Sequence, residues 1–507
     1  MNSLQIFYLC NMRKMFRTAE IRELDRLTMK YEPIESVALM NRAALTVYDF
    51  IIKTFDNRKV LVVAGSGNNG GDGLVVADML AISSWDVEVW CYTNSKGERS
   101  SDCQYCYDKL LRGGRCKVHV DEVLPMVIDD DILVVDALFG TGLSRPLQGD
   151  MACCVRQINQ WKSVVVSIDL PSGLGEEATY EKQMSDVVYA THTVSFQFPK
   201  LAFFLPETAC YVGQWHVRDI GLHAEAIEQM PTNIFYMTQT TAENLLKTRS
   251  RFVHKGDMGR ALLFVGAYSM MGAAVLASKA CVNSGVGVLT TVVPRCGYEI
   301  MQISVPESLC ICSDETLHAT WNERFNIANI KAVGIGPGIG RDFRTKSFVR
   351  DVLDSYRDKG MVIDADALYH LKELIADGFS LPCKAILTPH EGEFDRLTHE
   401  HTTRLQRIQT AMSFANKHDV VVVLKGAYTA IVTPDQRVIY NTTGNAGMAT
   451  GGSGDVLTGI ITALLAQGYD AEQAAMLGVN MHANAGDKAK TIYGEMGVTA
   501  TRMLDSL

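Results

Sequence analysis

Long apolar runs, an excess of basic residues and a regular cysteine spacing are all missing from this sequence. No stretch of about 18 apolar residues occurs, so the sequence does not predict a transmembrane helix. The formal net charge is −9, whereas proteins that neutralise nucleic-acid phosphates usually carry clustered Lys and Arg. We therefore expect neither a membrane-spanning protein nor a nucleic-acid-binding one.

The 13 cysteines lack the pattern of a disulfide framework, because their number is odd and their spacing is irregular. This usage indicates a reducing compartment, and we expect a cytoplasmic protein. Cys103 and Cys106 form a C-x-x-C pair, but no second pair follows at zinc-site spacing, and no βαβ context favours a redox motif. The apolar patch at residues 4–9 lacks a basic segment before it and a cleavage site after it, so no signal peptide is predicted.

The length of 507 residues exceeds what a single hydrophobic core usually serves, because cores stop growing near roughly 250 to 300 residues. The hydrophobic fraction of 47% and the charged fraction of 21% are close to those of globular proteins. We predict two domains, residues 1–225 and 235–507. The linker is expected around residues 221–232, where strand patterns stop and Pro231 interrupts the chain.

Both halves alternate short β-branched runs with helical patterns, which predicts an α/β fold with parallel sheets. The runs are almost continuously apolar, as expected of strands covered by helices on both faces. The first half is therefore predicted to be a doubly wound domain. The predicted strands lie at residues 59–65, 86–92, 131–140 and 163–173 in the first half, and at residues 260–267, 331–340, 360–368, 384–393 and 421–429 in the second.

A glycine-rich loop at residues 65–73 follows the first of these strands and opens a helical pattern, so its amides can face an anion. The loop contains G-x-G-x-x-G, but the next strand ends in residues 92–94 without the acidic residue that binds a ribose in NAD-dependent dehydrogenases. That class of enzyme is disfavoured. Glycines that only make a tight turn would not explain the polar residues within 68–72.

The second half has no Walker A pattern, so a nucleotide would be held by other loops. Residues 441–455 read NTTGNAGMATGGSGD before a helical pattern, so several amides and the positive end of a helix dipole converge. We expect an anion there, with Asp455 placed to take a proton from a hydroxyl group that is being phosphorylated. A helix cap is the alternative role of Asp455. The loop at residues 336–340 would look the same if it were only a glycine turn.

The motifs of the first half resemble those of NAD(P)H-hydrate epimerases over about residues 15–225. They are NNGGD at 68–72, VDALFGTGLSRPL at 135–147, SIDLPSGL at 167–174 and TVSFQFPK at 193–200. The resemblance implies a Rossmann-like isomerase domain that acts on a hydrated nicotinamide cofactor. It implies hydrate contacts from Asn68, Asn69, Gly70, Gly71, Asp72, Gly140, Thr141, Gly142, Leu143, Ser144, Arg145, Pro146 and Asp169, and a potassium ion held by Asn69, Asp136 and Ser172.

These residue types suit the implied chemistry. A monovalent cation takes several oxygen ligands, which carboxylate, amide and hydroxyl groups supply at the carboxyl ends of strands. Epimerisation at the C6 carbinol needs a group that assists loss and return of hydroxide, or ring opening, and Asp169 is the candidate acid/base. The alternative role of Asp169 is a helix cap before Pro171, and that of Asp136 is a strand-end cap.

The motifs of the second half resemble those of ribokinase-like NAD(P)H-hydrate dehydratases over about residues 240–500. They are HKG at 254–256, GAAVLASKA at 272–280, GPGIG at 336–340, VIDADAL at 362–368, TPHEGEF at 388–394 and the run at 441–455. The alternative role of His390 is a turn residue after Pro389, and that of Lys425 is a solvated charge. The resemblance implies hydrate contacts from Ala273, Gly338, His390 and Asp455, and nucleotide contacts from Lys425, Gly426, Ala427, Tyr428, Thr429 and Gly454.

Together the two resemblances imply a bifunctional NAD(P)H-hydrate repair enzyme, an isomerase fused to a lyase. It would interconvert the R- and S-hydrates and dehydrate the S form at the expense of ADP, giving NADH or NADPH, AMP and phosphate. Mg²⁺ is expected with ADP, K⁺ in the first domain, and a homo-oligomer as the assembly. The alternatives are a small-molecule kinase of vitamin metabolism and a first half that only binds nucleotides.

Overall fold

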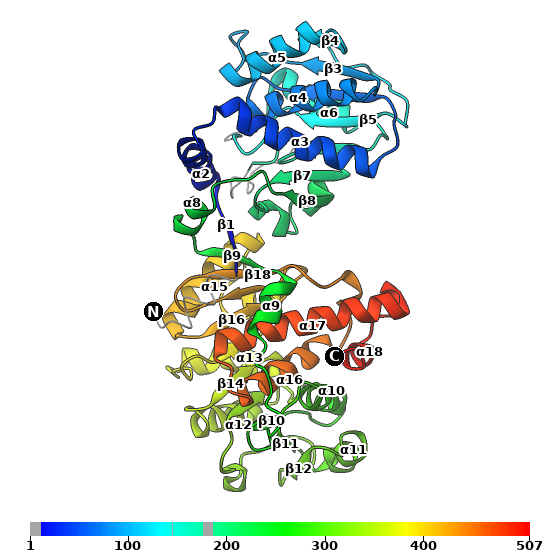
Figure 1. Ribbon diagram of the computed structural model, residues 1–507. Helices are drawn as coiled ribbons and strands as arrows, with labels where there is room; N and C mark the ends of the chain where they lie inside the picture. Colours follow the sequence, from blue (N-terminus) through cyan, green and yellow to red (C-terminus); the bar gives the residue numbers. More distant parts are fainter. Residues whose placement is uncertain (1–11, 144–145, 176–185) are drawn as a thin grey trace. The chain divides into compact units, whose positions relative to one another are not determined.

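The computed structural model describes residues 12–143, 146–175 and 186–507 (Figure 1). The chain divides into an N-terminal unit, Lys14–Thr232, and a C-terminal unit, Asn233–Leu507 together with the chain up to Arg13. The division falls between residues 232 and 233, whereas the sequence places the borders at 225 and 235. Helix α8 (Ala224–Gln229) explains the difference, because it packs with α2 (Thr18–Tyr31) and so belongs to the N-terminal unit.

A seven-stranded sheet of order β4-β3-β2-β5-β6-β7-β8 forms the centre of the N-terminal unit, and all its neighbouring strands are parallel. Its central strands are fully buried, which explains their continuous apolar sequence. The strands are β2 (Val60–Ala64), β3 (Val87–Cys91), β4 (Lys117–Val120), β5 (Leu133–Ala137), β6 (Val165–Ile168), β7 (His192–Phe196) and β8 (Gln214–Arg218).

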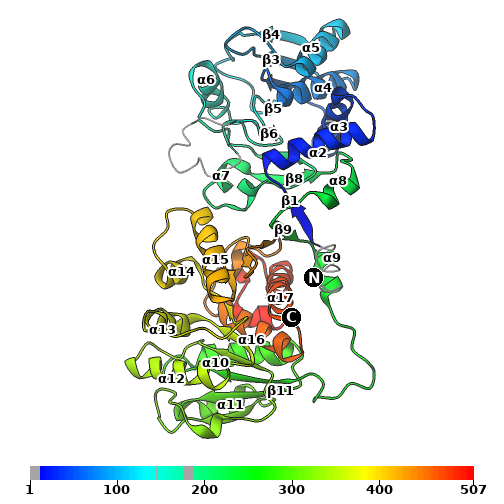
Figure 2. The same cartoon turned by 90° about the vertical axis from the view of Figure 1, so that its left-hand side faces the viewer.

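Helices cover both faces of this sheet, with α6 on one side and α3 and α4 on the other (Figure 2). Helix α4 leads from β2 to β3, whereas α6 leads from β5 to β6 in the opposite direction along the sheet. The predicted doubly wound fold is confirmed, and its topological switch point lies between β2 and β5. The helices between α2 and α8 are α3 (Ser36–Thr54), α4 (Asn68–Ile82), α5 (Ser101–Gly113), α6 (Gly149–Ile158) and α7 (Ala209–Val212).

The strands of the C-terminal unit belong to an 11-stranded sheet of order β1-β9-β18-β17-β16-β15-β14-β13-β10-β11-β12, whose edge strand β1 contains the border between Arg13 and Lys14. The strands from β16 to β12 in this order run parallel, and β17 and β18 join as an antiparallel pair. The strands are β1 (Arg13–Met15), β9 (Ile234–Met237), β10 (Arg260–Phe264), β11 (Val288–Val293), β12 (Leu309–Cys312), β13 (Ala332–Ile335), β14 (Gly360–Ile363), β15 (Ile386–Leu387), β16 (Val421–Leu424), β17 (Ala430–Val432) and β18 (Val438–Asn441).

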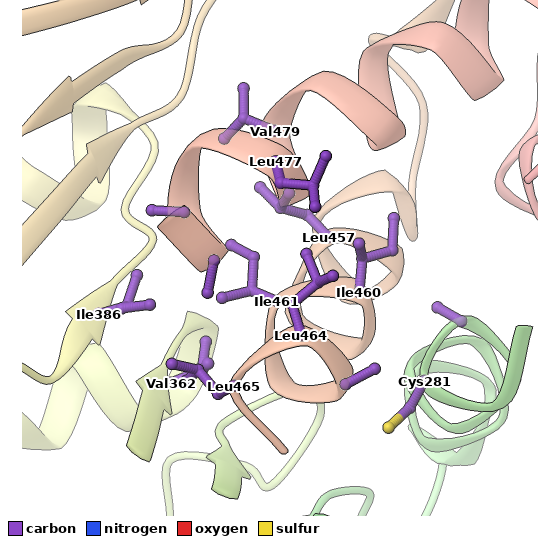
Figure 3. Packing of buried hydrophobic residues seen from close by; sticks show 14 of the residues in the cluster. Cys281, Val362, Ile386, Leu457, Ile460, Ile461, Leu464, Leu465, Leu477 and Val479 are labelled. Carbon is purple, nitrogen blue, oxygen red and sulfur yellow. The ribbon is translucent and has the colours of Figure 1, made fainter. Parts of the chain in front are cut away.

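The core of this unit lies where α10, α16 and α17 pack against the sheet. Figure 3 shows Leu457, Ile461 and Leu464 of α16 among side chains from neighbouring helices and strands. On the other face, Phe264 of β10 meets Phe348 of α12 with ring centroids 5.7 Å apart. The helices are α9 (Gln239–Leu245), α10 (Met271–Asn283), α11 (Tyr298–Ser304), α12 (Phe343–Ser355), α13 (Ala365–Ala376), α14 (Glu391–Leu397), α15 (Arg404–His418), α16 (Ser453–Ala466), α17 (Ala471–Tyr493) and α18 (Ala500–Leu504).

The sequence predicts neither a transmembrane helix nor a disulfide framework, and the described residues can be examined for both. Within residues 12–143, 146–175 and 186–507, no helix combines the length and apolar character that a membrane span needs. The cysteines of these segments are all free. Cys103 and Cys106 lie buried on α5, and burial raises the pKa of these thiols to about 12 and about 11. Both thiols are therefore protonated and poorly reactive, which disfavours a metal or redox role for the pair.

Candidate active sites

The glycine-rich loop after β2 lies at the switch point and leads into α4, whose first residue is Asn68. Two glycines are required by close packing. A methyl group on Gly65 would lie 2.0 Å from the carbonyl oxygen of Leu138, and one on Gly70 would lie 1.9 Å from that of Gly65. Gly67 has open space around it, so steric need does not account for it. The first amides of a helix have no partner within the helix, which makes this loop suited to a polar or anionic ligand.

Asp169 follows β6 at the same edge of the sheet, and its backbone lies in the left-handed region with φ +66°. Its Oδ1 lies 3.1 Å from Nζ of Lys200 and accepts a hydrogen bond of 3.3 Å from Oγ of Ser195. Lys200 is 1% exposed, so the pair is shielded from water. No helix begins after Asp169 in the described residues up to 175, which argues against the alternative role as a helix cap. Such backbone strain at a paired carboxylate is typical of functional sites.

Two further carboxyl groups lie near this pair. Burial raises the pKa of Asp25 to about 6, against the opposing charge of Lys200. Burial also raises the pKa of Asp72 well above its usual value, and the negative charges of Asp169 and Asp25 raise it further. Oδ1 of Asp72 has no hydrogen-bond partner among the described residues. Burial and the neighbouring acidic groups therefore favour the neutral form of Asp72, while Asp169 in the same site lies against the ammonium group of Lys200.

Asp136 at the end of β5 is fully buried, and no described cationic side chain forms a salt bridge with it. Its carboxylate accepts hydrogen bonds from Oγ of Ser172 (2.5 Å), the Ser172 amide (2.9 Å) and Oγ of Ser167 (2.8 Å). The Leu138 amide also donates to it at 3.3 Å, so Asp136 caps the strand end as well. A buried carboxylate without a cation, next to hydroxyl and carbonyl oxygens, is a donor set that suits a monovalent cation.

The other residues predicted to contact the hydrate lie on the loop after β5 and at the start of α4. A methyl group on Gly140 would lie 3.3 Å from Oδ1 of Asn69 and from Oδ2 of Asp169. The Thr141 amide donates to Oδ2 of Asp169 at 3.4 Å. Nδ2 of Asn69 is buried without a partner in the described structure, so it is available to a ligand. Gly142, Leu143 and Pro146 lie on the same loop, and Asn68 accepts from Ser100, whereas Ser144 and Arg145 lie outside the described residues.

The buried ion pair gives a stability prediction. Lys200→Met will lower the free energy of unfolding of the N-terminal unit by about 3–5 kcal/mol, because it leaves the carboxylate of Asp169 buried without its cation. Denaturant unfolding followed by tryptophan fluorescence will measure the loss. Lys53→Met is the matched control, since Lys53 pairs with Asp49 on the exposed side of α3 and exposed pairs contribute little. Equal stability of both variants would contradict a structural role of the Lys200 pair.

A cavity of about 860 Å³ lies beside the first turn of α16 in the C-terminal unit. It is lined by every residue predicted to contact the nucleotide, by His390 and by residues of α17. Its walls come from segments that are far apart in the sequence, which the parallel strands bring to one edge of the sheet. The lining includes Lys425, Gly426, Ala427, Tyr428, Thr429, Gly454, His390, Asn441, Thr443, Asn445, Ser453, Val479 and His482.

Asp455 lies in the first turn of α16, while the N-cap position is taken by Gly452. Beside it, Nζ of Lys425 lies 3.1 Å from Oδ1 of Asp364 and 3.7 Å from Oε2 of Glu393. Oδ2 of Asp364 accepts a hydrogen bond of 2.7 Å from Thr458 on the next turn of α16. Lys425 is therefore held by buried carboxylates, which argues against the alternative of a solvated charge.

Burial raises the pKa of Asp455 to about 7, with a further rise from Asp364 and an opposing effect of Lys425. A general base works in its deprotonated form, so kcat/KM for the dehydration that the sequence predicts should rise with pH and level off above about 7. Lys425→Met removes the charge that lowers this pKa, so the midpoint of the profile should move to higher pH. Lys372→Met on the exposed side of α13 should leave the midpoint unchanged. An unshifted midpoint in Lys425→Met would contradict the coupling.

The residues predicted to contact the hydrate occupy two places. A methyl group on Gly338 would lie 3.1 Å from Cβ of Ala273, so the GPGIG loop and the start of α10 adjoin. His390 caps α14, because its Nδ1 accepts from the amides of Gly392 and Glu393 at 3.1 and 3.3 Å. His390 therefore has a structural role in the turn, as its alternative interpretation states, and it also lines the cavity.

Several residues of both sites were not singled out by the sequence. They are Asp25, Lys200, Asp364, Glu393 and His482, which contact or adjoin the predicted residues. Lys200, Asp364 and Glu393 lie inside the motifs TVSFQFPK, VIDADAL and TPHEGEF, so the motifs carried a signal for them. Asp25 and His482 lie in amphipathic helices, where the sequence pattern gives no indication of a site. The HKG motif at 254–256 precedes β10, and His254 is exposed and outside the cavity.

These two folds and sites define an α/β protein that joins a Rossmann-like unit to a ribokinase-like unit. A family model described as NAD(P)H-hydrate dehydratase matches residues 261–507, and one described as YjeF-related protein N-terminus matches residues 36–202. The chain is 36% identical over 515 residues to the bifunctional NAD(P)H-hydrate repair enzyme of Moorella thermoacetica, covering 96% of this chain and 95% of that protein. The chain belongs to the family of bifunctional NAD(P)H-hydrate repair enzymes.

Other relatives and solved structures extend the comparison. The repair enzyme of Thermofilum pendens is 33% identical over 507 residues, covering 97% of this chain and 95% of that protein. A ribokinase-like superfamily protein of Enterococcus faecalis is 27% identical, with a TM-score of 0.49, and the match covers 54% of this chain and 94% of that one. An ADP/ATP-dependent NAD(P)H-hydrate dehydratase of Bacillus subtilis is 30% identical, with a TM-score of 0.46, covering 53% of this chain and 94% of that one.

Proposed function

We propose that this protein repairs damaged nicotinamide cofactors. Its N-terminal unit interconverts the R- and S-hydrates of NADH and NADPH, and its C-terminal unit dehydrates the S-hydrate at the expense of ADP. The observation that carries the proposal is the similarity to a repair enzyme over 96% of the chain. It favours the repair function over the alternative of a vitamin kinase, because the similarity includes the epimerase half.

In the N-terminal unit, Asp169 is the proposed acid/base at the C6 carbinol, and Nζ of Lys200 lies 3.1 Å from its carboxyl group. Burial raises the pKa of Asp72, which suits a group that gives a proton to the departing hydroxyl group. The glycine loop and the unpaired Nδ2 of Asn69 bind the hydrate. Asn69, Asp136 and Ser172 would hold K⁺, which would compensate the buried charge of Asp136 and fix the neighbouring loops.

In the C-terminal unit, Asp455 takes the proton of the C6 hydroxyl group, whose oxygen attacks the terminal phosphorus of ADP. The bond from that phosphorus to the bridging oxygen breaks, and AMP leaves. The amides at the start of α16 and the ammonium of Lys425 stabilise the charge that develops on the phosphoryl group. Phosphate then leaves from C6 while a proton is lost from C5, which restores the dihydronicotinamide ring. Phosphorylation is needed because hydroxide is a poor leaving group.

Mg²⁺ would neutralise the phosphates of ADP. The described residues contain no group of three His, Cys, Asp or Glu side chains placed to hold a metal ion. Mg²⁺ does not require such a group, because it commonly keeps its waters and binds through the substrate phosphates with one or two carboxylates. A homo-oligomeric assembly and the use of ADP in preference to ATP are further parts of the proposal, and both rest on the family resemblance.

Chemically hydrated NADH tests the proposal directly. The full chain with ADP and Mg²⁺ should restore the absorbance of reduced nicotinamide, and AMP and phosphate should form in equal amounts. A vitamin kinase would leave the hydrate unchanged and would phosphorylate a vitamin alcohol instead. Failure to consume either epimer in the presence of ADP or ATP would overturn the repair function.

A further inference from the structure

A second cavity, of about 540 Å³, lies in the N-terminal unit beyond the residues assigned to the hydrate. It is formed at the carboxyl ends of β3 and β4 and at the start of α6, on the α6 face of the sheet. Tyr92, Leu124 and Met151 provide apolar and aromatic surface, while polar groups come from the segments after the two strands. A cavity of this size fits a nucleoside.

One loop of the described chain joins this cavity to the candidate epimerase site. The segment after β3 lines the cavity with Asn94 and Ser95 and then returns to the glycine-rich loop, where Ser100 donates to Oδ1 of Asn68 at 2.9 Å. The Ser100 amide also donates to the carbonyl oxygen of Ser66 at 2.9 Å. Gln148, which precedes α6, also lines the cavity. The cavity and the candidate epimerase site therefore lie at the carboxyl ends of the adjacent parallel strands β3 and β2.

The charge of the cavity indicates which nucleoside it accepts. The described residues that line it include Asp121, Glu122 and Asp150, and none of these described residues is Lys or Arg. Asp121 follows β4 and is held at the end of β3, because its carboxylate accepts from the amide and Oγ1 of Thr93 at 2.8 and 2.9 Å. The acidic residue that is missing at the end of β3 is thus supplied by the neighbouring strand. In dinucleotide-binding folds an acidic residue at this position binds the ribose hydroxyls, whereas a 2′-phosphate requires a cationic residue.

We propose that this cavity binds the adenosine half of the hydrated dinucleotide during epimerisation and favours the hydrate of NADH over that of NADPH. The inference rests on the proposed epimerase function and adds the subsite that recognises the part of the substrate far from the reacting carbon. Binding energy from such a part of a substrate supports the chemistry at the reacting centre. Removing the adenosine half should therefore lower kcat/KM for epimerisation.

The test compares the purified R-hydrates of NADH, NADPH and reduced nicotinamide mononucleotide, which lacks the adenosine half. Epimerisation is followed by chromatography without ADP, so that dehydration does not remove the product, and a reaction without enzyme gives the spontaneous rate. Met151→Trp fills the cavity from its wall. Val127→Trp is the control, because Val127 is 82% exposed in the same unit and does not line the cavity. Gln148→Lys places a cation in the lining without removing a hydrogen bond that its side chain makes to a described residue.

Wild-type protein should epimerise NADH hydrate more efficiently than NADPH hydrate and the mononucleotide hydrate. Met151→Trp should lower kcat/KM for NADH hydrate by at least about tenfold, the lower range for a misfit in a binding pocket, and leave the mononucleotide hydrate unchanged. Activity on the mononucleotide hydrate also shows that the variant is folded. Gln148→Lys should raise the ratio of NADPH hydrate to NADH hydrate, and Val127→Trp should match wild type.

Three results would overturn the subsite. Met151→Trp could affect both substrates equally or neither, or the wild type could use the mononucleotide hydrate as efficiently as NADH hydrate. In these cases the proposed epimerase function stands, because epimerisation is still observed. If the wild type epimerises none of the hydrates, the proposed function fails and the subsite fails with it.

Discussion

Asp455→Asn will lower ADP-dependent dehydration of the S-hydrate by about a hundredfold to ten-thousandfold, the range typical of a lost general base. The variant keeps the amides of α16 and the glycine loop, so adenine-nucleotide affinity should stay close to that of wild type. The structure is consistent with this separation, because Lys425 and Gly454 line the cavity that is proposed to hold the nucleotide, whereas Asp455 is not among its lining residues. Its pKa of about 7 also suits a base that works near neutral pH.

Single-turnover dehydration and direct titration with ADP will measure the two quantities separately. Asp354→Asn is the matched control, because Asp354 is a half-exposed carboxylate on α12 of the same unit. It should change neither quantity. Near-normal turnover in Asp455→Asn would exclude the base role, and a large loss of ADP affinity would mean that the carboxylate organises the nucleotide site instead.

Asp169→Ala will stop the chain from completing the repair of a mixture of R- and S-hydrates. With ADP in excess, the wild type consumes both epimers, because the R-hydrate is converted as the S-hydrate is removed. The variant should consume the S-hydrate at the wild-type rate and then stall, leaving the R-hydrate to disappear only at the spontaneous rate. The two chemistries separate because Asp169 belongs to the N-terminal unit and Asp455 to the C-terminal unit.

Chiral chromatography of the residual hydrate, with a reaction lacking enzyme, will measure this loss. Asp108→Ala on the exposed side of α5 is the control and should clear both epimers. Because Ala leaves Lys200 without its partner, Asp169→Asn serves as a second variant that keeps an oxygen to accept from the Thr141 amide. Clearance of the R-hydrate at the wild-type rate by both variants would rule out Asp169 as the acid/base.

The sequence determined the fold class and the segments that carry the sites. Continuously apolar, β-branched runs are typical of strands that are covered on both faces. These runs predicted the buried parallel strands β2, β5 and β6. Glycine-rich segments after such strands lie at one edge of the sheet, which placed the loops at 65–73 and 441–455 next to helix starts. The motifs also identified the family, since their residue types and order are properties of the chain alone.

The tertiary structure decided which side chains meet. Lys425 pairs with Asp364 across 61 residues, and Thr458 donates to the same carboxylate across 94 residues. The sheet order sets these pairings, and spacing along the sequence does not encode it. The raised pKa values of Asp72 and Asp455 likewise depend on burial by elements far away in the chain. Asp121 reaches the end of β3 for the same reason, because β4 lies beside β3 in the folded sheet.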